Sequence, residues 1–407
     1  MLIKLLAHTS GDIHGDIEIS GSKSESNRLL ILQKIYNNLE LKNLSNSDDT
    51  IHLQEALVSN EDVIDIGHAG TAMRFLTAYL SATAGKEIVL TGSNRMQNRP
   101  IKILVDALRS LGADIQYAAK EGYPPLRIKG KKLTKNKVSI NGNVSSQYIS
   151  ALLLIASTLE NGLEIELLGK VTSVPYIKMT LALLNDLNIE SHWNGNFIKI
   201  KPKKEIKSKT LTVESDWSSA SYFYSLVALS KNGKVKLSSY KKDSLQGDNS
   251  LVETYKHFGV KTVFKKDTIT LIKEDVELKP LTLDLVNSPD LAQTIAVTCF
   301  GLGLACDLTG LHTLKIKETD RLVALKNELE KLGAQVEITE ESLHLKASDK
   351  INSDVSIETY EDHRMAMAFA PLALKTTINI ANAEVVTKSF TSFWEDFESV
   401  LDNVIRE

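Results

Sequence analysis

Short polar segments followed by strongly apolar runs recur along the chain, and they predict helices buried on almost every face. The first is Gly21–Arg28, where small hydroxylated residues and two cations precede the apolar run Leu29–Leu32. A helix with so little polar surface must be covered by other elements. Aligned on such polar-to-apolar starts, six copies begin at Ser24, Gly70, Ser145, Ser218, Pro289 and Asp362. After the first copy the spacing is about 71–75 residues, the length of a supersecondary unit.

A strand, a loop and a second, amphipathic helix are expected after each apolar helix. The expected strands are Leu39–Leu44, Glu87–Thr91, Leu163–Leu168, Lys234–Ser238, Ala305–Thr309 and Thr377–Ala381. Four of the second helices end with Gly or Asn where a left-handed terminator belongs. These endings are Leu111-Gly112-Ala113, Leu187-Asn188-Ile189, Phe258-Gly259-Val260 and Leu332-Gly333-Ala334. The first copy is expected to be abbreviated around Leu53–Asn60, and the last to end around Ser392–Val400.

A repeated helix–strand–loop–helix–strand unit predicts an α/β protein of two domains with three copies each. The 407 residues exceed what one ordinary core holds. We expect a break near Ser215, after the lysine-rich segment Lys199–Lys209. Because the N-terminal strand precedes the first copy, it is expected to pair with the later domain. Residues 1–20 and 215–407 would then form one domain and residues 21–214 the other, with the chain crossing twice.

Net charge, cysteine content and the length of apolar runs indicate which classes of protein the chain can belong to. With a net charge of -3, the chain has no global field for nucleic acid or membrane, so an anion site must come from local clustering of cations. Cys299 and Cys306 lie in an apolar stretch and are expected to be buried thiols, as in a reducing compartment. The start Met1–Lys4 lacks the layout of a signal peptide, and the apolar run Ile149–Ala156 is too short to span a bilayer. We therefore expect a cytoplasmic protein.

Candidate chemistry gathers at the first helix start and at the loop before the second helix of each copy. Seven of these side chains are cationic: Lys23, Arg28, Arg99, Lys317, Arg321, Arg364 and Lys388. Helix starts attract anions, and arginine forks grip carboxylate and phosphate groups. Convergence of these cations would suit substrates that carry several negative charges.

Each motif taken alone has a structural interpretation. Ser145 and Ser146 could only cap a helix, and Asp290 after Pro289 could only complement a helix dipole. The run Lys317–Arg321 could be a charged first helical turn, and His363 could be a buried histidine with its hydrogen bonds made. Six similar starts with differing polar content are harder to explain by capping alone. The histidines lack the spacing of a metal site, so no metal is expected.

Taken in order, these motifs resemble the EPSP synthase (3-phosphoshikimate 1-carboxyvinyltransferase) family over nearly the whole chain. The most specific are Lys317-Glu318-Thr319-Asp320-Arg321 and Asp362-His363-Arg364-Met365. The others are Gly21–Arg28, Ala69–Arg74, Arg95–Pro100, Val144–Gln147, Ser218–Phe223 and Pro289-Asp290.

The resemblance implies a two-domain inside-out α/β barrel with the active site in the cleft between the domains. It implies that the 5-hydroxyl of shikimate 3-phosphate attacks C2 of phosphoenolpyruvate, after which the intermediate eliminates phosphate. This is a shikimate-pathway step toward chorismate and aromatic amino acids, and the family is the target of glyphosate. The expected partners are these two small molecules, with no metal, organic cofactor, nucleic acid or membrane, and the expected state is a monomer.

The resemblance also assigns roles to individual residues. Catalysis falls to Asp290, Glu318 and Lys23. The shikimate 3-phosphate ligands are Lys23, Ser24, Arg28, Ser145, Ser146, Gln147, Ser173, Tyr176, Asp290 and Lys317. The phosphoenolpyruvate ligands are Lys23, Gly70, Arg99, Gln147, Arg321, Arg364 and Lys388. The chain departs from the family pattern at His68, at Thr313, at Ser215-Asp216-Trp217 and at Glu361.

Two alternatives stay open at this point. A related enolpyruvyl transferase acting on a UDP-amino sugar shares the fold and the donor, but it is not expected to carry the run Lys317–Arg321. A non-catalytic phosphometabolite-binding protein belongs to a different class. Asp290 and Glu318 argue against it, because carboxylates disfavour a bound anion.

Overall fold

The computed structural model describes residues 1–8, 11–401 and 404–406, and the chain forms two compact units. The inserted unit is Gly21–Val213, and the discontinuous unit is Met1–Ser20 with Glu214–Glu407. The chain thus returns to the discontinuous unit at Glu214, one residue earlier than expected. Glu214 belongs there because its carboxylate accepts hydrogen bonds from Trp217 Nε1 at 2.8 Å and from Ser244 Oγ at 2.6 Å.

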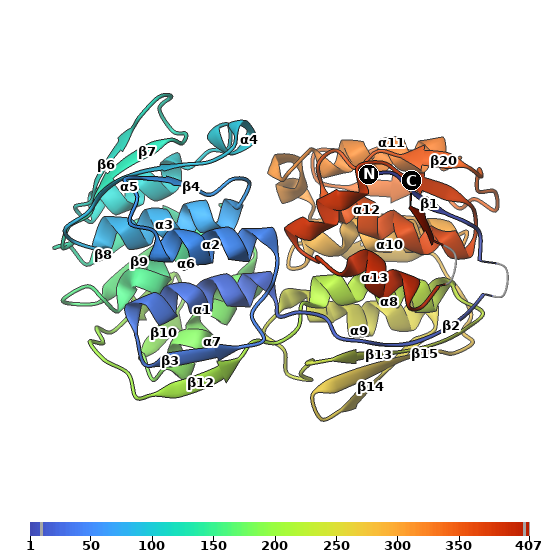
Figure 1. The fold of residues 1–407 in the computed structure, drawn as a ribbon, viewed down its shortest axis with the longest axis horizontal. Helices are drawn as coiled ribbons and strands as arrows, with labels where there is room; N and C mark the ends of the chain where they lie inside the picture. Colours follow the sequence, from blue (N-terminus) through green and yellow to red (C-terminus); the bar gives the residue numbers. More distant parts are fainter. Residues whose placement is uncertain (9–10, 402–403, 407) are drawn as a thin grey trace. The chain divides into compact units, whose positions relative to one another are not determined.

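In the inserted unit, helices α1, α3 and α6 run through the middle and strands lie outside them (Figure 1). The helices are α1 (Lys23–Ile35), α2 (Asp48–Val58), α3 (Gly70–Ala82), α4 (Asn94–Gln97), α5 (Lys102–Ser110), α6 (Ser146–Ala156) and α7 (Val174–Asp186). The strands are β3 (Leu39–Lys42), β4 (Val63–Asp65), β5 (Glu87–Thr91), β6 (Asp114–Tyr117), β7 (Leu126–Lys129), β8 (Lys137–Asn141), β9 (Leu163–Leu168), β10 (Ser191–Asn194), β11 (Phe197–Ile200) and β12 (Lys209–Thr212). They form sheets in the orders β4-β5-β7-β6, β10-β11-β9-β8 and β12-β3.

The discontinuous unit repeats this plan around α8, α10 and α12 (Figure 1). Its helices are α8 (Trp217–Leu229), α9 (Leu251–Thr254), α10 (Ala292–Gly301), α11 (Arg321–Lys331), α12 (His363–Phe369) and α13 (Phe393–Glu398). Short 3-10 turns are η1 (Gly247–Ser250), η2 (Tyr255–Phe258), η3 (Pro289–Leu291), η4 (His312–Ile316), η5 (Ala370–Leu374) and η6 (Ala383–Lys388). Its strands are β1 (Ile3–Leu5), β2 (Asp12–Ile17), β13 (Asn232–Ser238), β14 (Val260–Lys265), β15 (Thr268–Lys273), β16 (Leu281–Asp284), β17 (Cys306–Thr309), β18 (Val336–Ile338), β19 (Leu343–Leu345), β20 (Val355–Ile357), β21 (Ile378–Ile380) and β22 (Val404–Arg406).

The repeat explains the sheet topology. In each of the sheets β14-β15-β13-β2, β16-β17-β19-β18 and β20-β21-β1-β22, one parallel pair joins strands of neighbouring copies and the other pairs are antiparallel. The N-terminal segment pairs with the later domain as predicted, since β2 lies parallel to β13 and β1 antiparallel to β21. The first copy has only the two-stranded sheet β12-β3.

The central prediction, helices buried on almost every face, is confirmed most fully in the discontinuous unit. Every residue of α8, α10 and α12 is buried. The expected helix terminators are also confirmed, because Gly112, Asn188, Gly259 and Gly333 all have positive φ. Cys299 and Cys306 are buried and free. Within the described residues, no helix combines the length and apolar character needed to cross a bilayer.

One boundary prediction is wrong. The second helix of the first copy, α2, begins at Asp48 instead of near Leu53. Asp48 and Asp49 suit a first turn, because acidic side chains complement the positive end of the helix dipole. The run Lys317–Arg321 lies in the loop before the second helix, as expected, and α11 begins at its last residue, Arg321, behind the capping residue Asp320. The Asp320 carboxylate accepts from the backbone N–H groups of Leu322 and Val323.

Trp217, a departure from the family pattern, is a core residue of the discontinuous unit. Its ring is fully buried and meets Tyr240 edge to face, with 4.9 Å between ring centroids. We expect Trp217→Ala to lower the free energy of unfolding by about 3–5 kcal/mol, because it leaves a cavity in the core. Urea unfolding followed by far-UV circular dichroism measures this. Trp193→Ala, at a partly exposed strand position, is the control and should cost less. A larger loss for the Trp193 variant would contradict the assignment.

Candidate active site

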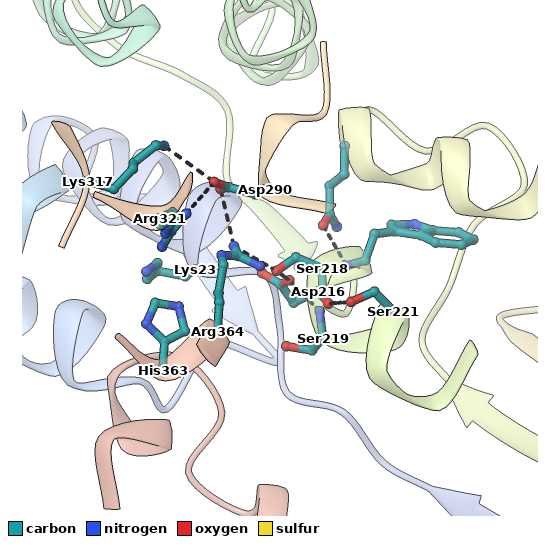
Figure 2. A network of polar contacts seen from close by, with 12 residues as sticks. Lys23, Asp216, Ser218, Ser219, Ser221, Asp290, Lys317, Arg321, His363 and Arg364 are labelled. Atoms are coloured by element: carbon teal, nitrogen blue, oxygen red, sulfur yellow. Dashed lines mark hydrogen bonds and ion pairs between the residues drawn. The ribbon is translucent and has the colours of Figure 1, made fainter. Parts of the chain in front are cut away.

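In the discontinuous unit, three predicted cations converge on Asp290 (Figure 2). Asp290 lies in the turn η3 before α10. Its carboxylate accepts from Arg321 Nη1 at 2.8 Å and from Arg364 Nη2 at 3.2 Å, and Lys317 Nζ lies 3.4 Å away. Burial alone would raise the pKa of Asp290, but Arg364, Lys317 and Arg321 together hold that pKa well below its usual range. Asp290 is therefore a carboxylate.

Arg321, the first residue of α11, joins three carboxylates while almost fully buried. Besides Asp290, it donates from Nε to Asp362 Oδ2 at 2.6 Å and from Nη2 to Glu318 Oε2 at 2.8 Å. Glu318 also faces Lys388 Nζ at 3.2 Å. The planar guanidinium fork can bind several oxygen atoms at fixed angles, which a lysine cannot. Asp290 and Glu318, the two predicted proton carriers, are thereby held on one cation.

Arg364 connects Asp290 to the start of α8. Its Nη2 donates to Ser218 Oγ at 3.2 Å, and its Nη1 donates to Tyr222 Oη at 3.5 Å. The Ser218 hydroxyl donates in turn to Asp216, whose carboxylate caps α8 (Figure 2). His363, beside Arg364 at the start of α12, is buried with its Nδ1 3.7 Å from Asp362 Oδ1.

All four predicted cations of this unit are therefore paired with acidic side chains. Lys317 and Arg364 pair with Asp290, and Lys388 pairs with Glu318. Arg321 pairs with Asp290, Glu318 and Asp362. An anionic substrate must compete with these carboxylates for the same donors. The arrangement can exchange one set of ion pairs for another, and the carboxylate released from a cation becomes a stronger base.

In the inserted unit, Arg28 ties three helices together. Its guanidinium donates to Thr180 Oγ1 at 2.8 Å, to Ser150 Oγ at 3.0 Å, to the Ser24 carbonyl at 2.7 Å and to the Tyr176 carbonyl at 3.4 Å. These partners lie on α1, α6 and α7. Burial lowers the pKa of Arg28 to about 10, still far above neutrality, so the group stays charged. Ser24 and Tyr176 thus contact Arg28 through their backbone carbonyl groups.

The other predicted residues of this unit lie at helix starts. The Ser145 hydroxyl accepts a hydrogen bond from Gln147 N at 3.4 Å and so caps the start of α6. Gln147 donates to Thr71 Oγ1 at 3.2 Å, which places it beside the start of α3. Ser146 is buried as the first residue of α6, and Ser173 precedes α7 in a left-handed conformation. Lys23 lies 3.6 Å from Asp49, a partner that the sequence did not indicate.

Gly70, Arg74 and Arg99 form a group with excess positive charge. A Cβ on Gly70 would lie 2.5 Å from Arg99 Nη1 and 3.0 Å from Arg74 Nη1, so both guanidinium groups approach the bare glycine. Burial and the neighbouring charge of Arg99 lower the pKa of Arg74 to about 10. Within the described residues, neither Arg74 Nε nor Arg99 Nε has a hydrogen-bond partner. This group is suited to receive an anion at the start of α3.

Sequence reasoning missed the acidic and hydroxyl partners, above all Asp248 in the turn η1. Asp248 is buried, and no described group donates to its Oδ1. Burial, aided by the nearby charge of Asp290, raises the pKa of Asp248 to about 7. Its local sequence resembles an ordinary polar turn, so no pattern pointed to it. The departures His68 and Thr313 have other environments: His68 Nδ1 lies 3.0 Å from Ser93 Oγ, and the Thr313 hydroxyl finds no partner in the described part of the chain.

The raised pKa of Asp248 predicts how stability depends on pH. Its pKa in the folded protein is about 7, whereas an aspartate in an unfolded chain ionises near 4. Between those values the unfolded chain has lost the proton and the folded protein retains it, so the free energy of unfolding falls as pH rises. Asp248→Asn cannot ionise and should gain stability over the native protein between about pH 5 and pH 8, by on the order of a few kcal/mol.

Urea unfolding at the two pH values measures this gain. The control is Asp354→Asn, at an exposed carboxylate whose pKa is lowered by hydrogen bonds from Asn379 and Lys4. That variant should show no gain. Equal behaviour of the two variants would contradict a cost of ionising buried Asp248.

Known proteins share both the fold and the sequence of this chain. Residues 52–397 match the family described as EPSP synthase (3-phosphoshikimate 1-carboxyvinyltransferase). A 3-phosphoshikimate 1-carboxyvinyltransferase of Bacteroides fragilis (strain YCH46) is 45% identical over 398 residues, which cover 97% of each chain. The protein of that name from Histophilus somni (strain 2336) is 38% identical over 434 residues, covering 98% of this chain and 99% of the relative.

Two solved structures share the fold at low sequence identity. The EPSP synthase from Acinetobacter baumannii superposes with a TM-score of 0.81 at 21% identity, with 99% of each chain covered. The enolpyruvyl transferase NikO from Streptomyces tendae superposes with a TM-score of 0.76 at 13% identity, covering 99% of this chain and 98% of that one. These likenesses show the two-domain α/β fold but do not distinguish between transferases. The matches in sequence do distinguish, and by them the chain belongs to the EPSP synthase (3-phosphoshikimate 1-carboxyvinyltransferase) family.

Proposed function

We propose that this chain transfers the carboxyvinyl group of phosphoenolpyruvate to the 5-hydroxyl of shikimate 3-phosphate and releases phosphate. The observation that carries the proposal is Arg321, which binds Asp290 and Glu318 at the same time. The reaction needs one group to take the hydroxyl proton and another to move protons at the former methylene carbon. Two carboxylates on one guanidinium provide such a pair, and their separate neighbours can divide the two tasks.

Asp290 is the proposed proton acceptor. In this structure Arg321, Arg364 and Lys317 keep Asp290 ionised, and the same cations are the proposed partners of substrate anions. Negative charge delivered by phosphoenolpyruvate and shikimate 3-phosphate offsets these cations, so the pKa of Asp290 rises when the substrates are bound. The base becomes stronger at the moment when the hydroxyl is in place.

Glu318 is the proposed proton carrier at the carbon. The hydroxyl oxygen adds to C2 of phosphoenolpyruvate, and C3 gains a proton to become a methyl group. Removal of a methyl proton then expels phosphate and restores the double bond. Lys388 and Arg321, which flank Glu318, are the proposed groups that stabilise negative charge on the leaving phosphate.

The inserted unit is proposed to bind the anionic groups of both substrates. Arg28, Ser24, Ser145, Ser146, Gln147, Ser173 and Tyr176 are the proposed ligands of shikimate 3-phosphate, and Gly70 and Arg99 those of phosphoenolpyruvate, with Lys23 shared. Support comes from Arg28, Arg74 and Arg99, which make no ion pair with any described carboxylate within 4.0 Å. Arg28 and Arg74 are buried, and a bound anion lowers the cost of burying their charges. We also propose that the protein acts as a monomer in the cytoplasm and that glyphosate inhibits it.

Phosphate release from purified protein tests the proposal. With phosphoenolpyruvate present, shikimate 3-phosphate should support release and a UDP-amino sugar should not. Asp290→Asn and Glu318→Gln should keep substrate binding and lower turnover by about 10²–10⁴-fold, the usual contribution of a general acid or base. Asp354→Asn, at an exposed carboxylate in the same unit, is the control and should retain turnover. Binding of both substrates without release would favour a non-catalytic binding protein.

Gly70→Ala tests the anion group at the start of α3. The new Cβ would overlap Arg99 Nη1, so the guanidinium must move away from its present position. We expect the KM for phosphoenolpyruvate to rise by at least about tenfold, because a charged hydrogen bond is weakened. Gly301→Ala is the control, since its Cβ would instead meet Leu229 and Leu372 in the core. That variant should lose stability and keep its KM. An unchanged KM in Gly70→Ala would remove Arg99 from phosphoenolpyruvate binding.

A further inference from the structure

The connection from β20 to α12 contains two consecutive non-glycine residues in the left-handed conformation. Tyr360 has a φ of 53° and Glu361 a φ of 56°. Side chains with a Cβ disfavour this conformation, and such residues persist where surrounding contacts hold them. The connection ends at Asp362, one residue before α12 begins. Something outside the connection must therefore maintain its shape.

Glu328 of α11 holds the first part of the connection. It is fully buried, and its Oε1 accepts from Tyr360 Oη at 2.6 Å. Its Oε2 accepts from Glu358 N at 3.1 Å and from Lys331 Nζ at 2.7 Å. A buried carboxylate with three donors is well satisfied and has one preferred position. Burial and this hydrogen bond to Glu328 raise the pKa of Tyr360 to about 12, so the hydroxyl remains a donor over the working pH range.

Arg321 of the same helix holds the second part. It lies seven residues before Glu328, about two helical turns away on the same face. It donates to both carboxylate oxygens of Asp362, at 2.6 and 3.3 Å. Helix α11 thus binds the connection both before and after the left-handed pair, through Glu358 and through Asp362.

The shape of the connection decides where the next side chains lie. Asp362 N donates to the Thr359 carbonyl at 2.8 Å, and Asp362 Oδ1 accepts from Arg364 N at 2.9 Å to start α12. Arg364 then reaches Asp290 and Ser218. A turn that relaxed to ordinary backbone angles would move the start of α12, and the Arg364 guanidinium would move with it.

We propose that Glu328 and Tyr360 form a clamp that keeps residues 360 and 361 left-handed and so positions Asp362 and Arg364 for phosphoenolpyruvate. The clamp residues are positioning residues, because they meet Arg364 only through the connection. This inference rests on the proposed function for the identity of the ligand. The geometry of the clamp itself does not depend on that identity.

The test uses Tyr360→Phe and Glu328→Gln in the full chain. Tyr360→Phe keeps the ring and removes only the hydroxyl. We expect the KM for phosphoenolpyruvate to rise about tenfold in each variant, the KM for shikimate 3-phosphate to stay within about twofold, and kcat to change little. Tyr224→Phe is the matched control, because the Tyr224 hydroxyl shares a hydrogen bond with Thr262 and not with a clamp residue. It should leave both KM values unchanged, although it also removes a hydroxyl from a buried tyrosine.

A second substitution separates positioning from general stability. Glu361→Gly, added to Tyr360→Phe, permits positive φ without a steric cost. It should restore the KM for phosphoenolpyruvate, whereas a purely structural role of the hydroxyl would give no such rescue. An unchanged KM in Tyr360→Phe, or a raised KM that Glu361→Gly does not restore, would overturn the clamp.

Amide hydrogen exchange of residues 358–364 gives a readout that needs no substrate. Exchange should be faster in Tyr360→Phe than in the native protein and slow again in the double variant. If the native protein releases no phosphate, the proposed function fails while this measurement still decides the clamp. Equal exchange in the native protein and Tyr360→Phe would overturn the clamp even if the enzyme is active.

Discussion

The ion pairs of Arg321 are the contacts on which the rest of the site depends. This one guanidinium contacts Asp290 before α10, Glu318 before α11 and Asp362 before α12. Each carboxylate belongs to a different connection of the discontinuous unit. A buried charge demands that its partners stay close, so Arg321 draws the three connections to one point. Asp290 and Glu318 are fixed relative to each other because they share this partner.

The cations of the two units have different partners. In the discontinuous unit the cations already face carboxylates, so substrate binding there is an exchange of partners. In the inserted unit Arg28 is held by hydroxyl and carbonyl oxygens, and Arg74 and Arg99 have unpartnered Nε atoms among the described residues. Because the hydrogen-bond partners of Arg28 carry no charge, its guanidinium group remains available to an anion. An exchange of partners instead links binding to the basicity of Asp290.

The repeated fold makes this convergence available. Helices buried along their whole length place their first turns at equivalent positions in each copy, and the glycine and asparagine terminators return the chain to the outer sheets. Three copies in a unit therefore bring three helix starts and three loops within reach of one another. Small differences in sequence between the copies are then enough to form a site with different charged groups at each helix start. The turn at Tyr360 and Glu361 is one such difference. Both residues have a left-handed backbone conformation, which glycine adopts more readily than residues with a Cβ.

The sequence by itself determined the repeat, the buried helices, the pairing of the N-terminal segment and the cationic residues of the site. Periodicity and helix-start signals are local, so Gly70, Asp290 and Arg364 stood out without any knowledge of their neighbours. Only the tertiary structure decided which groups face them. Asp248, Asp49, Ser150, Thr180 and Glu328 carry no distinctive local pattern, because their roles come from burial and from partners far away in the chain. The run Lys317–Arg321 could be placed in the loop before a second helix from its position in the repeat. The Asp320 cap that ends this loop is recognised only from its hydrogen bonds, because those bonds form when the chain has folded.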